Sequence, residues 1–154
     1  LDHEDATGIH YTGWQRGAYP TADTARSIFD AGTLYVGVDE TGAVWGSMNL
    51  NGQQLPEYQN GAWTIPAEDR QVAVIHTLTI DPARAGQGLA RQMVAFAEDT
   101  ARRQGKTVLR LDTGTENLPA NRMYPALGYK AAGTVDTFFM GYAQRPLNLY
   151  EKKL

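Results

Sequence analysis

Two stretches of the chain repeat their hydrophobic residues at the spacing of an amphipathic α-helix. Across residues 89–103 the apolar positions follow this spacing, two arginines occupy the last turn, and Gly105 comes just after it. Residues 21–31 begin with a capping-type threonine, carry apolar side chains at helical spacing and end at Gly32. The sequence predicts these two helices and a shorter one from about 120 to 127.

Three segments before the long helix have the composition of β-strands. Residues 34–38 and 43–50 flank the turn sequence Asp-Glu-Thr-Gly at 39–42, which is the pattern of an antiparallel hairpin. Residues 71–80 are β-branched and apolar on both faces, which is typical of a strand buried at the centre of a sheet, and the Asp-Pro at 81–82 ends it. The sequence therefore predicts a hairpin followed by a central strand.

The second half of the chain adds three more strands. The 89–103 helix joins the strand predicted at 107–112 to the central strand, so the two should form a right-handed parallel β-α-β unit. Residues 130–137 and 146–152 should form an antiparallel pair joined near Gly141. One parallel pair is thus expected among antiparallel ones.

Two regions lack a periodic pattern. Residues 51–70 contain glycines, prolines and aromatic residues, and loops of this length are usually functional or disordered. The chain begins with Leu1 rather than Met, which leaves open whether an N-terminal strand or helix in residues 1–20 is incomplete.

Composition narrows the class of protein. The 154 residues fit a single domain spanning 1–154, and the 42% hydrophobic and 20% charged residues are ordinary for a globular protein. A formal net charge of −3 argues against a general electrostatic attraction to nucleic acid or to an anionic membrane. The absence of cysteine excludes disulfides, a thiolate nucleophile and cysteine-ligated metal.

The sequence shows neither a targeting segment nor a metal-binding motif. No apolar run approaches the roughly 20 residues of a membrane helix, and residues 1–20 show no signal peptide, so a cytoplasmic location is expected. His3 and His10 do not stand at a metal-ligand spacing, so no metal site is expected.

A loop rich in small residues lies between the central strand and the long helix. Gly86, Gly88 and Ala90 let a phosphate group approach the backbone, and the first amides of the helix are unpaired donors at its positive end. The same composition also suits a simple connection between a strand and a helix. The loop matches neither the dinucleotide-binding nor the nucleotide-triphosphatase signature.

A second cluster follows this loop along the chain. It has the form N-x-x-A-x-x-x-Y-x-x-x-G-[FY], and its residues are Asn117, Ala120, Tyr124, Gly128 and Tyr129. Together with the loop, whose family form is [QR]-x-x-G-x-[GA], it resembles the GNAT-type N-acetyltransferase family. The resemblance extends from Trp14 to the C-terminus.

One position departs from the family pattern. Aligning Gly88 and Ala90 with the small residues of the family places Ala85 where the family has Arg or Gln. In the family this position contributes mainly a backbone amide to the pyrophosphate, so the resemblance still implies acetyl-CoA (coenzyme A) as the cofactor. Arg84 or Arg91 is the candidate for the missing side-chain contact.

The resemblance implies a fold and a cofactor site. The fold is an α/β (α+β) domain with a mixed, mostly antiparallel, twisted sheet of six or seven strands, a splayed central parallel pair and helices on both faces. Acetyl-CoA would lie in the gap between the splayed strands, with its pantetheine along the first strand and its pyrophosphate on the loop. The cofactor-binding residues so implied are Leu78, Thr79, Ile80, Arg84, Ala85, Gly86, Gln87, Gly88, Leu89, Ala90, Arg91, Asn117, Ala120, Asn121 and Tyr124.

Four residues are candidates for catalysis. By resemblance, the phenol of Tyr124 would protonate the departing CoA thiolate, whereas its structural alternative is a half-buried helix tyrosine with a satisfied hydroxyl. An amine must be neutral to attack, and the candidate bases are, in order, His76, Glu57 and Asp112. Their ordinary alternatives are a satisfied strand histidine, a solvated loop carboxylate and a turn cap.

Many aromatic residues stand at irregular or edge positions. They are expected either to wall a pocket for an apolar or cationic amine or to cover the ends of the sheet, with Trp45 in the core. The candidate substrate-binding residues are Trp14, Tyr19, Tyr58 and Trp63.

The expected function is acetyl transfer from acetyl-CoA to a primary amine of a small molecule or peptide, by direct attack and without a covalent enzyme intermediate. The alternatives are an acyl-CoA-binding regulatory module without catalysis and an acyltransferase acting on a protein N-terminus or lysine. No basic stripe supports nucleic-acid binding. A homodimer is also expected, formed through an exposed final strand at 146–152.

Overall fold

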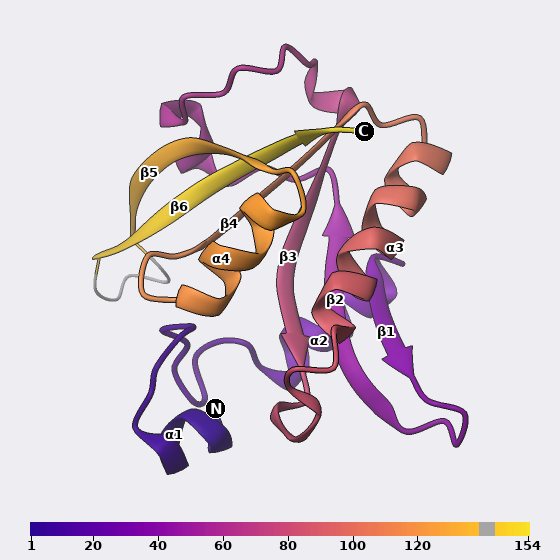
Figure 1. The fold of residues 1–154 in the computed structure, drawn as a ribbon, viewed down its shortest axis with the longest axis vertical. Coiled ribbons are helices and arrows are strands. Elements are labelled where there is room, and N and C mark those ends of the chain that lie inside the picture. The colour runs from indigo at the N-terminus through magenta and orange to yellow at the C-terminus, as the bar shows by residue number, and fades with distance from the viewer. Residues whose placement is uncertain (139–143) are drawn as a thin grey trace.

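The computed structural model describes residues 1–138 and 144–154 of the chain (Figure 1). Its α-helices are α1 (Asp2–Thr7), α2 (Ala22–Asp30), α3 (Leu89–Arg103) and α4 (Leu118–Ala126). Its strands are β1 (Leu34–Val38), β2 (Val44–Asn51), β3 (Val72–Ile80), β4 (Val108–Gly114), β5 (Lys130–Phe138) and β6 (Gln144–Lys153). Three short 3₁₀ helices are η1 (Pro56–Asn60), η2 (Asp69–Gln71) and η3 (Pro82–Arg84).

The strands form one sheet in the order β1-β2-β3-β4-β6-β5. All neighbours pair antiparallel except β3 and β4, which are parallel, as the sequence predicted. The last strand, β6, pairs with β4 on one side and β5 on the other. The expectation that 146–152 is an exposed edge is therefore wrong. The predicted turn near Gly141 lies outside the described residues.

Each face of the sheet has its own hydrophobic core. Ala73 and Ile75 of β3 pack with α3 and α4 in one core, whereas Val72 and Val74 face the other side and pack with the 55–67 segment. In Figure 1, α3 and α4 lie in front of the sheet and α2 lies behind it, which confirms helices on both faces. Full burial of one such aliphatic side chain contributes roughly 2 kcal/mol.

The central parallel strands pair over only part of their length. Their pairing begins at Val72 and Val108 and ends at Ile75 and Leu111, although both strands continue. Beyond that point β3 stays with β2 and β4 stays with β6, so the two central strands diverge, as Figure 1 shows. A bulge at Thr77, whose φ is 49°, lies in the diverging part of β3. The splayed pair expected from the resemblance is present.

Local signals explain where the helices begin. The Thr21 side chain accepts a hydrogen bond from the backbone of Thr24 in a capping box, and α2 follows it. The long helix α3 has the predicted bounds. Helix α4 begins two residues before the predicted start, because the Asn117 side chain caps it by accepting from the Ala120 N–H at 3.2 Å.

The 51–70 segment is not the structureless loop that the sequence predicted, since it contains η1 and η2 and covers the second face of the sheet. Buried charge holds it there. Glu151, 1% exposed, accepts hydrogen bonds from the N–H groups of Thr64 and Ile65 at 2.6 and 3.1 Å. The guanidinium of Arg110 donates to Gln54 at 2.7 Å and lies 4.2 Å from the centre of the Trp63 ring.

Within residues 1–138 and 144–154, no helix is long and apolar enough to cross a membrane. The same residues contain no cluster of three or more His, Asp or Glu side chains arranged to hold a metal ion.

Candidate active site

A row of open backbone amides lies where β3 leads into α3. The Asp81 side chain accepts from the Ala83 N–H at 2.9 Å and shapes η3, after which Gly86 and Gly88 take φ values of 78° and 76°. In the described part of the chain, the N–H groups of residues 86–91 make no hydrogen bond. Added to the positive end of the helix dipole, these donors form a site suited to a phosphate group.

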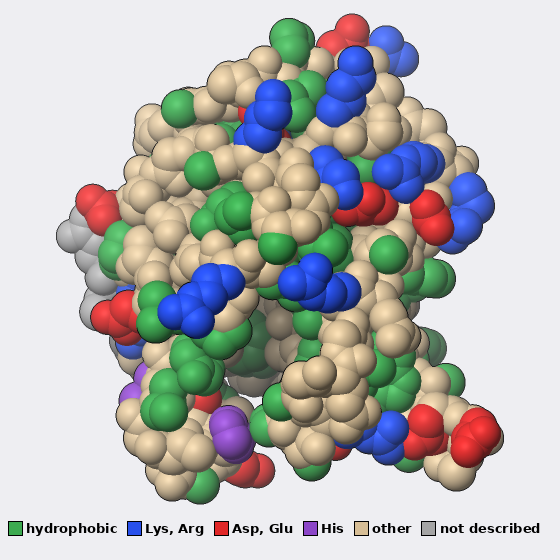
Figure 2. Space-filling view, viewed as in Figure 1, with side chains coloured by type: hydrophobic (Ala, Val, Ile, Leu, Met, Phe, Trp, Pro, Cys, Tyr) green, Lys and Arg blue, Asp and Glu red, His purple; other side chains and the backbone are tan. Residues whose placement is uncertain are grey.

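The two arginines near this loop have different surroundings. Arg84 donates to the Asp39 carboxylate at 2.6 Å and ties the loop to the β1–β2 turn. A hydrogen bond from Thr41, together with the Arg84 guanidinium, holds the pKa of Asp39 well below its usual range. Arg91 is exposed in the first turn of α3. Figure 2 shows Lys and Arg side chains above a hollow that lies between the N-terminal segment and this loop.

Tyr124 is a buried tyrosine near the divergence of the strands. It is 5% exposed, and its ring packs 5.6 Å from that of Tyr129 and 5.7 Å from that of Tyr150, between ring centres. Its hydroxyl has no hydrogen-bond partner among the described residues. Burial, and next the negative charge of Asp112, raise the pKa of Tyr124, so its hydroxyl is protonated at neutral pH.

Asp112 stands on β4 just past the last parallel pair. Its carboxylate accepts a hydrogen bond from the Tyr58 hydroxyl at 2.8 Å. Burial raises the pKa of Asp112, the Tyr58 hydrogen bond lowers it, and the charge of Glu57 raises it again, for a net increase. Asp112 thus connects β4 to η1 rather than capping a turn.

The N-terminal segment also reaches Asp112. Burial raises the pKa of Tyr19, the charge of Asp112 adds to this rise, and a hydrogen bond with the side chain of Thr77 opposes it. The ring of Trp14 meets that of Tyr19 edge to face at 6.0 Å between centres. Tyrosines from two distant segments therefore surround one carboxylate.

His76 lies on the same face of the sheet as Asp112. Val74 and Arg110 are paired in register, and His76 and Asp112 each follow two residues later. The His76 Nε2 atom is 3.0 Å from the carbonyl oxygen of Gln53. Since a carbonyl only accepts hydrogen bonds, Nε2 carries the proton and Nδ1 keeps the lone pair. Burial lowers the pKa of His76, which favours this neutral form.

Other predicted site residues serve the fold in this structure. The Asn121 side chain donates to the carbonyl oxygens of Gly114, Thr115 and Asn117, and it accepts from Asn148 and Tyr150. The indole N–H of Trp63 donates to the Tyr58 carbonyl at 2.7 Å, and Trp45 packs against the core under α3.

Sequence reasoning missed Arg110 and Glu151, which hold the 51–70 segment against the sheet. For Arg110 the available signal was a charged residue between hydrophobic ones, in Val-Leu-Arg-Leu at 108–111, whereas Glu151 is followed by two lysines and gives no such signal. It also missed Thr77, whose positive φ carries no sequence signal of its own.

Known proteins share this fold, and one family model matches most of the chain. A family model described as the acetyltransferase (GNAT) family matches residues 3–129. The uncharacterized N-acetyltransferase MJ1207 from Methanocaldococcus jannaschii is 32% identical over 68 residues, which cover 44% of this chain and 30% of that protein. The match therefore spans less than a third of that relative.

Two solved structures illustrate the likeness of fold. A GCN5-related N-acetyltransferase from Kribbella flavida has a TM-score of 0.71 at 22% identity, covering 99% of this chain and 88% of its own. The protein yncA from Salmonella typhimurium, described as an acetyltransferase with its cofactor acetyl-CoA, has a TM-score of 0.69 at 19% identity. That alignment covers 99% of this chain and 84% of yncA.

Proposed function

The chain belongs to the acetyltransferase (GNAT) family, and from that premise we propose that it transfers the acetyl group of acetyl-CoA to a primary amine by direct attack. One observation carries the proposal. The central strands diverge between a row of open backbone amides and a buried phenol that lacks a partner in the described residues. The transfer uses an anion site to hold the phosphates of the cofactor and a proton donor for the departing sulfur, and here the two lie on either side of a gap.

The residues at the gap fit acetyl-CoA. The open amides of 86–91 are suited to its pyrophosphate, and Arg91 is the nearby exposed cation. At 78–80, β3 is paired with β2 but not with β4, so its other edge can bind the pantetheine amides as an added strand would. When bound, acetyl-CoA supplies an acetyl group activated as a thioester.

Tyr124 is the proton donor in this proposal. The transfer forms a carbon–nitrogen bond and breaks a carbon–sulfur bond, so a neutral amine loses one proton and the departing sulfur gains one. The raised pKa of Tyr124 keeps its hydroxyl protonated and ready to donate to sulfur. The proton released by nitrogen restores the phenol, and the products are the amide and the free thiol.

His76 is the proposed proton acceptor. Its imidazole is neutral near pH 7 because burial lowers its pKa, and the Gln53 carbonyl fixes the Nε2–H tautomer. The Nδ1 lone pair is then available to take the proton that an ammonium must lose before attack. Asp112 and Glu57 lie on the same side and add negative charge that attracts a cationic acceptor.

The test combines binding with turnover. Calorimetric titration of the protein with acetyl-CoA should show binding, and adding primary amines should release free CoA. Tyr124→Phe should lower kcat about a hundredfold, because it removes the proton donor, while the Kd for acetyl-CoA changes less than about twofold. Tyr150→Phe is the matched control, since its ring packs against the same tyrosine, and its kcat should stay close to that of the unmodified protein.

Three results would contradict the proposal in different ways. No binding of acetyl-CoA would reject the cofactor site. Binding without CoA release from any amine would favour a cofactor-binding module without catalysis. Unchanged turnover in Tyr124→Phe, with chemistry limiting the rate, would remove Tyr124 from the reaction.

A further inference from the structure

The sheet face that carries Asp112 continues into a separate pocket. Gly114 follows Asp112 by two residues on β4, so the two share a face and stand about 7 Å apart. Beyond Gly114 lies a pocket of about 280 Å³, lined by residues 11–12, 114–116 and 145–147. A Cβ atom at Gly114 would come within 3.3 Å of the Tyr11 carbonyl oxygen, so the N-terminal segment approaches β4 closely at this glycine.

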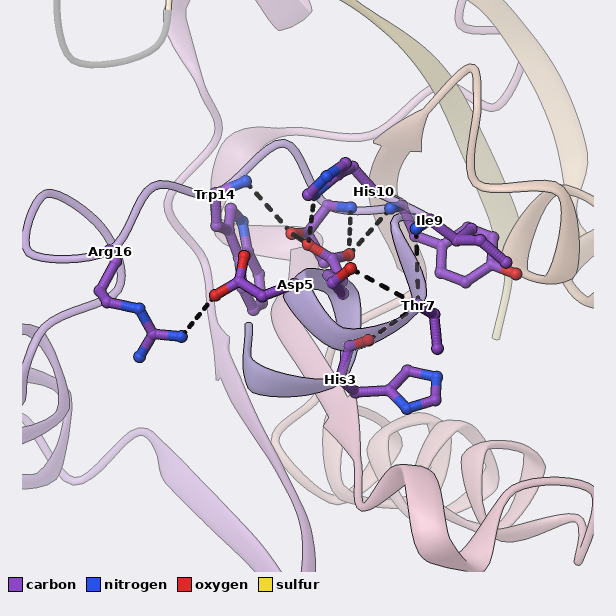
Figure 3. A network of polar contacts seen from close by, with 10 residues as sticks. His3, Asp5, Thr7, Ile9, His10, Trp14 and Arg16 are labelled. Atoms are coloured by element: carbon purple, nitrogen blue, oxygen red, sulfur yellow. Dashed lines mark hydrogen bonds and ion pairs between the residues drawn. The ribbon is translucent and has the colours of Figure 1, made fainter.

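One wall of the pocket belongs to the N-terminal segment, whose network of polar contacts is shown in Figure 3, and a buried carboxylate holds this segment in place. Glu4, 7% exposed, accepts hydrogen bonds from the N–H groups of Tyr11 and Thr12 at 2.8 and 3.0 Å. It also accepts from the Thr12 hydroxyl at 3.1 Å, and that hydroxyl accepts from the Trp14 N–H. These bonds fix the backbone of the N-terminal segment beside the end of β4.

The opposite wall carries a cation. The guanidinium of Arg145 lies directly on the Gly13 backbone, because a Cβ atom on Gly13 would sit 2.4 Å from its Cζ atom. Within residues 1–138 and 144–154, Arg145 makes no ion pair, although Glu116 lines the same pocket. A positive charge without a carboxylate partner at the end of a pocket is suited to an anionic group of a ligand.

Two residues before Gly114, β4 carries the opposite charge at Asp112. The Asp112 carboxylate, with the rings of Tyr58 and Tyr19 beside it and the charge of Glu57 close by, attracts an ammonium group. An α-amino acid would place its own carboxylate next to its amine, against these acidic groups. An acceptor with its two charges well separated avoids that repulsion.

We propose, on the basis of the proposed function, that the acceptor is a small ω-amino acid or similar zwitterion, with a primary amine at Asp112 and an anionic group at Arg145. The spacing along β4 requires several carbon atoms between the two groups. The pocket then acts as a specificity element, because it selects an acceptor by the end that does not react.

The test compares three acceptors of matched size: 5-aminopentanoate, pentylamine and 1,5-diaminopentane. With the unmodified protein, kcat/KM measured by CoA release should be at least tenfold higher for 5-aminopentanoate than for either other amine. Arg145→Met should lower kcat/KM for 5-aminopentanoate to about that for pentylamine and so remove this preference. Arg26→Met, which removes an exposed arginine of α2 outside the pocket, should keep the preference.

A second readout does not depend on turnover. Calorimetry should detect binding of 5-aminopentanoate to the unmodified protein and at least a tenfold weaker Kd in Arg145→Met, while the thermal midpoint shows that the variant is folded. Equal kcat/KM for 5-aminopentanoate and pentylamine, or a preference for the diamine, would overturn this inference and leave the proposed function intact. Failure of all three amines, with no binding of 5-aminopentanoate, would also overturn this inference, whereas the proposed function is tested separately by the titration with acetyl-CoA and by CoA release with other amines.

Discussion

The two sides of the diverging strands contribute different groups to the site: one contributes backbone amides and the other contributes side chains. On the side of α3, the open amides that we propose for phosphate binding belong to consecutive residues 86–91 and need no side chain. On the opposite side, Asp112, Tyr58 and Tyr19 come from three segments distant in sequence. A site made of local backbone is encoded by a short motif, whereas a site made of distant side chains depends on the packing of the whole domain.

The two sides also depend on different stabilising forces. The amide row follows from glycine conformations and the start of one helix. The Tyr58 hydroxyl reaches Asp112 only while the 51–70 segment stays on the sheet, and the buried charges of Glu151 and Arg110 hold that segment there. Substitutions should therefore be able to impair acceptor binding without changing the affinity for acetyl-CoA, and the reverse.

The largest effect is expected for Glu151→Gln. This carboxylate is 1% exposed, and its loss leaves the Arg110 guanidinium without its facing charge, 3.9 Å away. Urea denaturation should show a decrease of about 3 kcal/mol in the free energy of unfolding. The folded fraction should keep its Kd for acetyl-CoA, while the KM for the acceptor rises.

Glu40→Gln provides the control, because Glu40 is an exposed carboxylate at the β1–β2 turn. Its free energy of unfolding should change by less than about 0.5 kcal/mol. If Glu151→Gln left the free energy of unfolding equally unchanged, or if it weakened the binding of acetyl-CoA and of the acceptor alike, the two sides of the site would not be separable in this way.

A smaller effect is expected for His76→Gln, which removes the imidazole from the acceptor side but supplies an amide N–H that can donate to the Gln53 carbonyl in its place. If neutral His76 accepts the proton, kcat falls about a hundredfold in the variant. In the unmodified protein, kcat should decrease as the pH falls through the pKa of His76, which burial places below its usual value of 6.5. A variant that kept this acid limb of the pH profile would assign the proton to Asp112, Glu57 or water.

Sequence patterns predicted the local structure around residues 86–103 far better than the placement of the 51–70 segment, for a physical reason. The helix at 89–103 and the glycines before it are short-range features, since periodicity and backbone conformation act within a few residues. The 51–70 segment shows no period because tertiary contacts, not local preference, hold it in place. The sequence singled out Tyr58 as a candidate substrate-binding aromatic residue, but neither its hydrogen bond to Asp112 nor the partners of Arg110 could be predicted from local patterns.

The same limit applies to the order of the strands. Residues 130–137 and 146–152 were predicted to pair, and they do, because adjacent strands of a hairpin are close in the chain. The insertion of β6 between β4 and β5 follows from the pairing of residues 108–114 with 147–153, which no local pattern indicates. Local pairing was thus predictable and strand order was not.

The smallest effect is expected for Gly88→Val, on the cofactor side. Gly88 has a φ of 76° and Gly105, at the other end of α3, has a φ of 75°, and a Cβ atom at either would meet nothing within 4 Å. Valine at either position should therefore destabilise the fold by a similar amount, about 1–2 kcal/mol.

Only Gly88 belongs to the open amides, so only Gly88→Val should raise the Kd for acetyl-CoA, by about tenfold, as measured by calorimetry. Equal affinities in the two variants would mean that the loop does not hold the pyrophosphate, and the two sides of the gap would then no longer divide cofactor from acceptor.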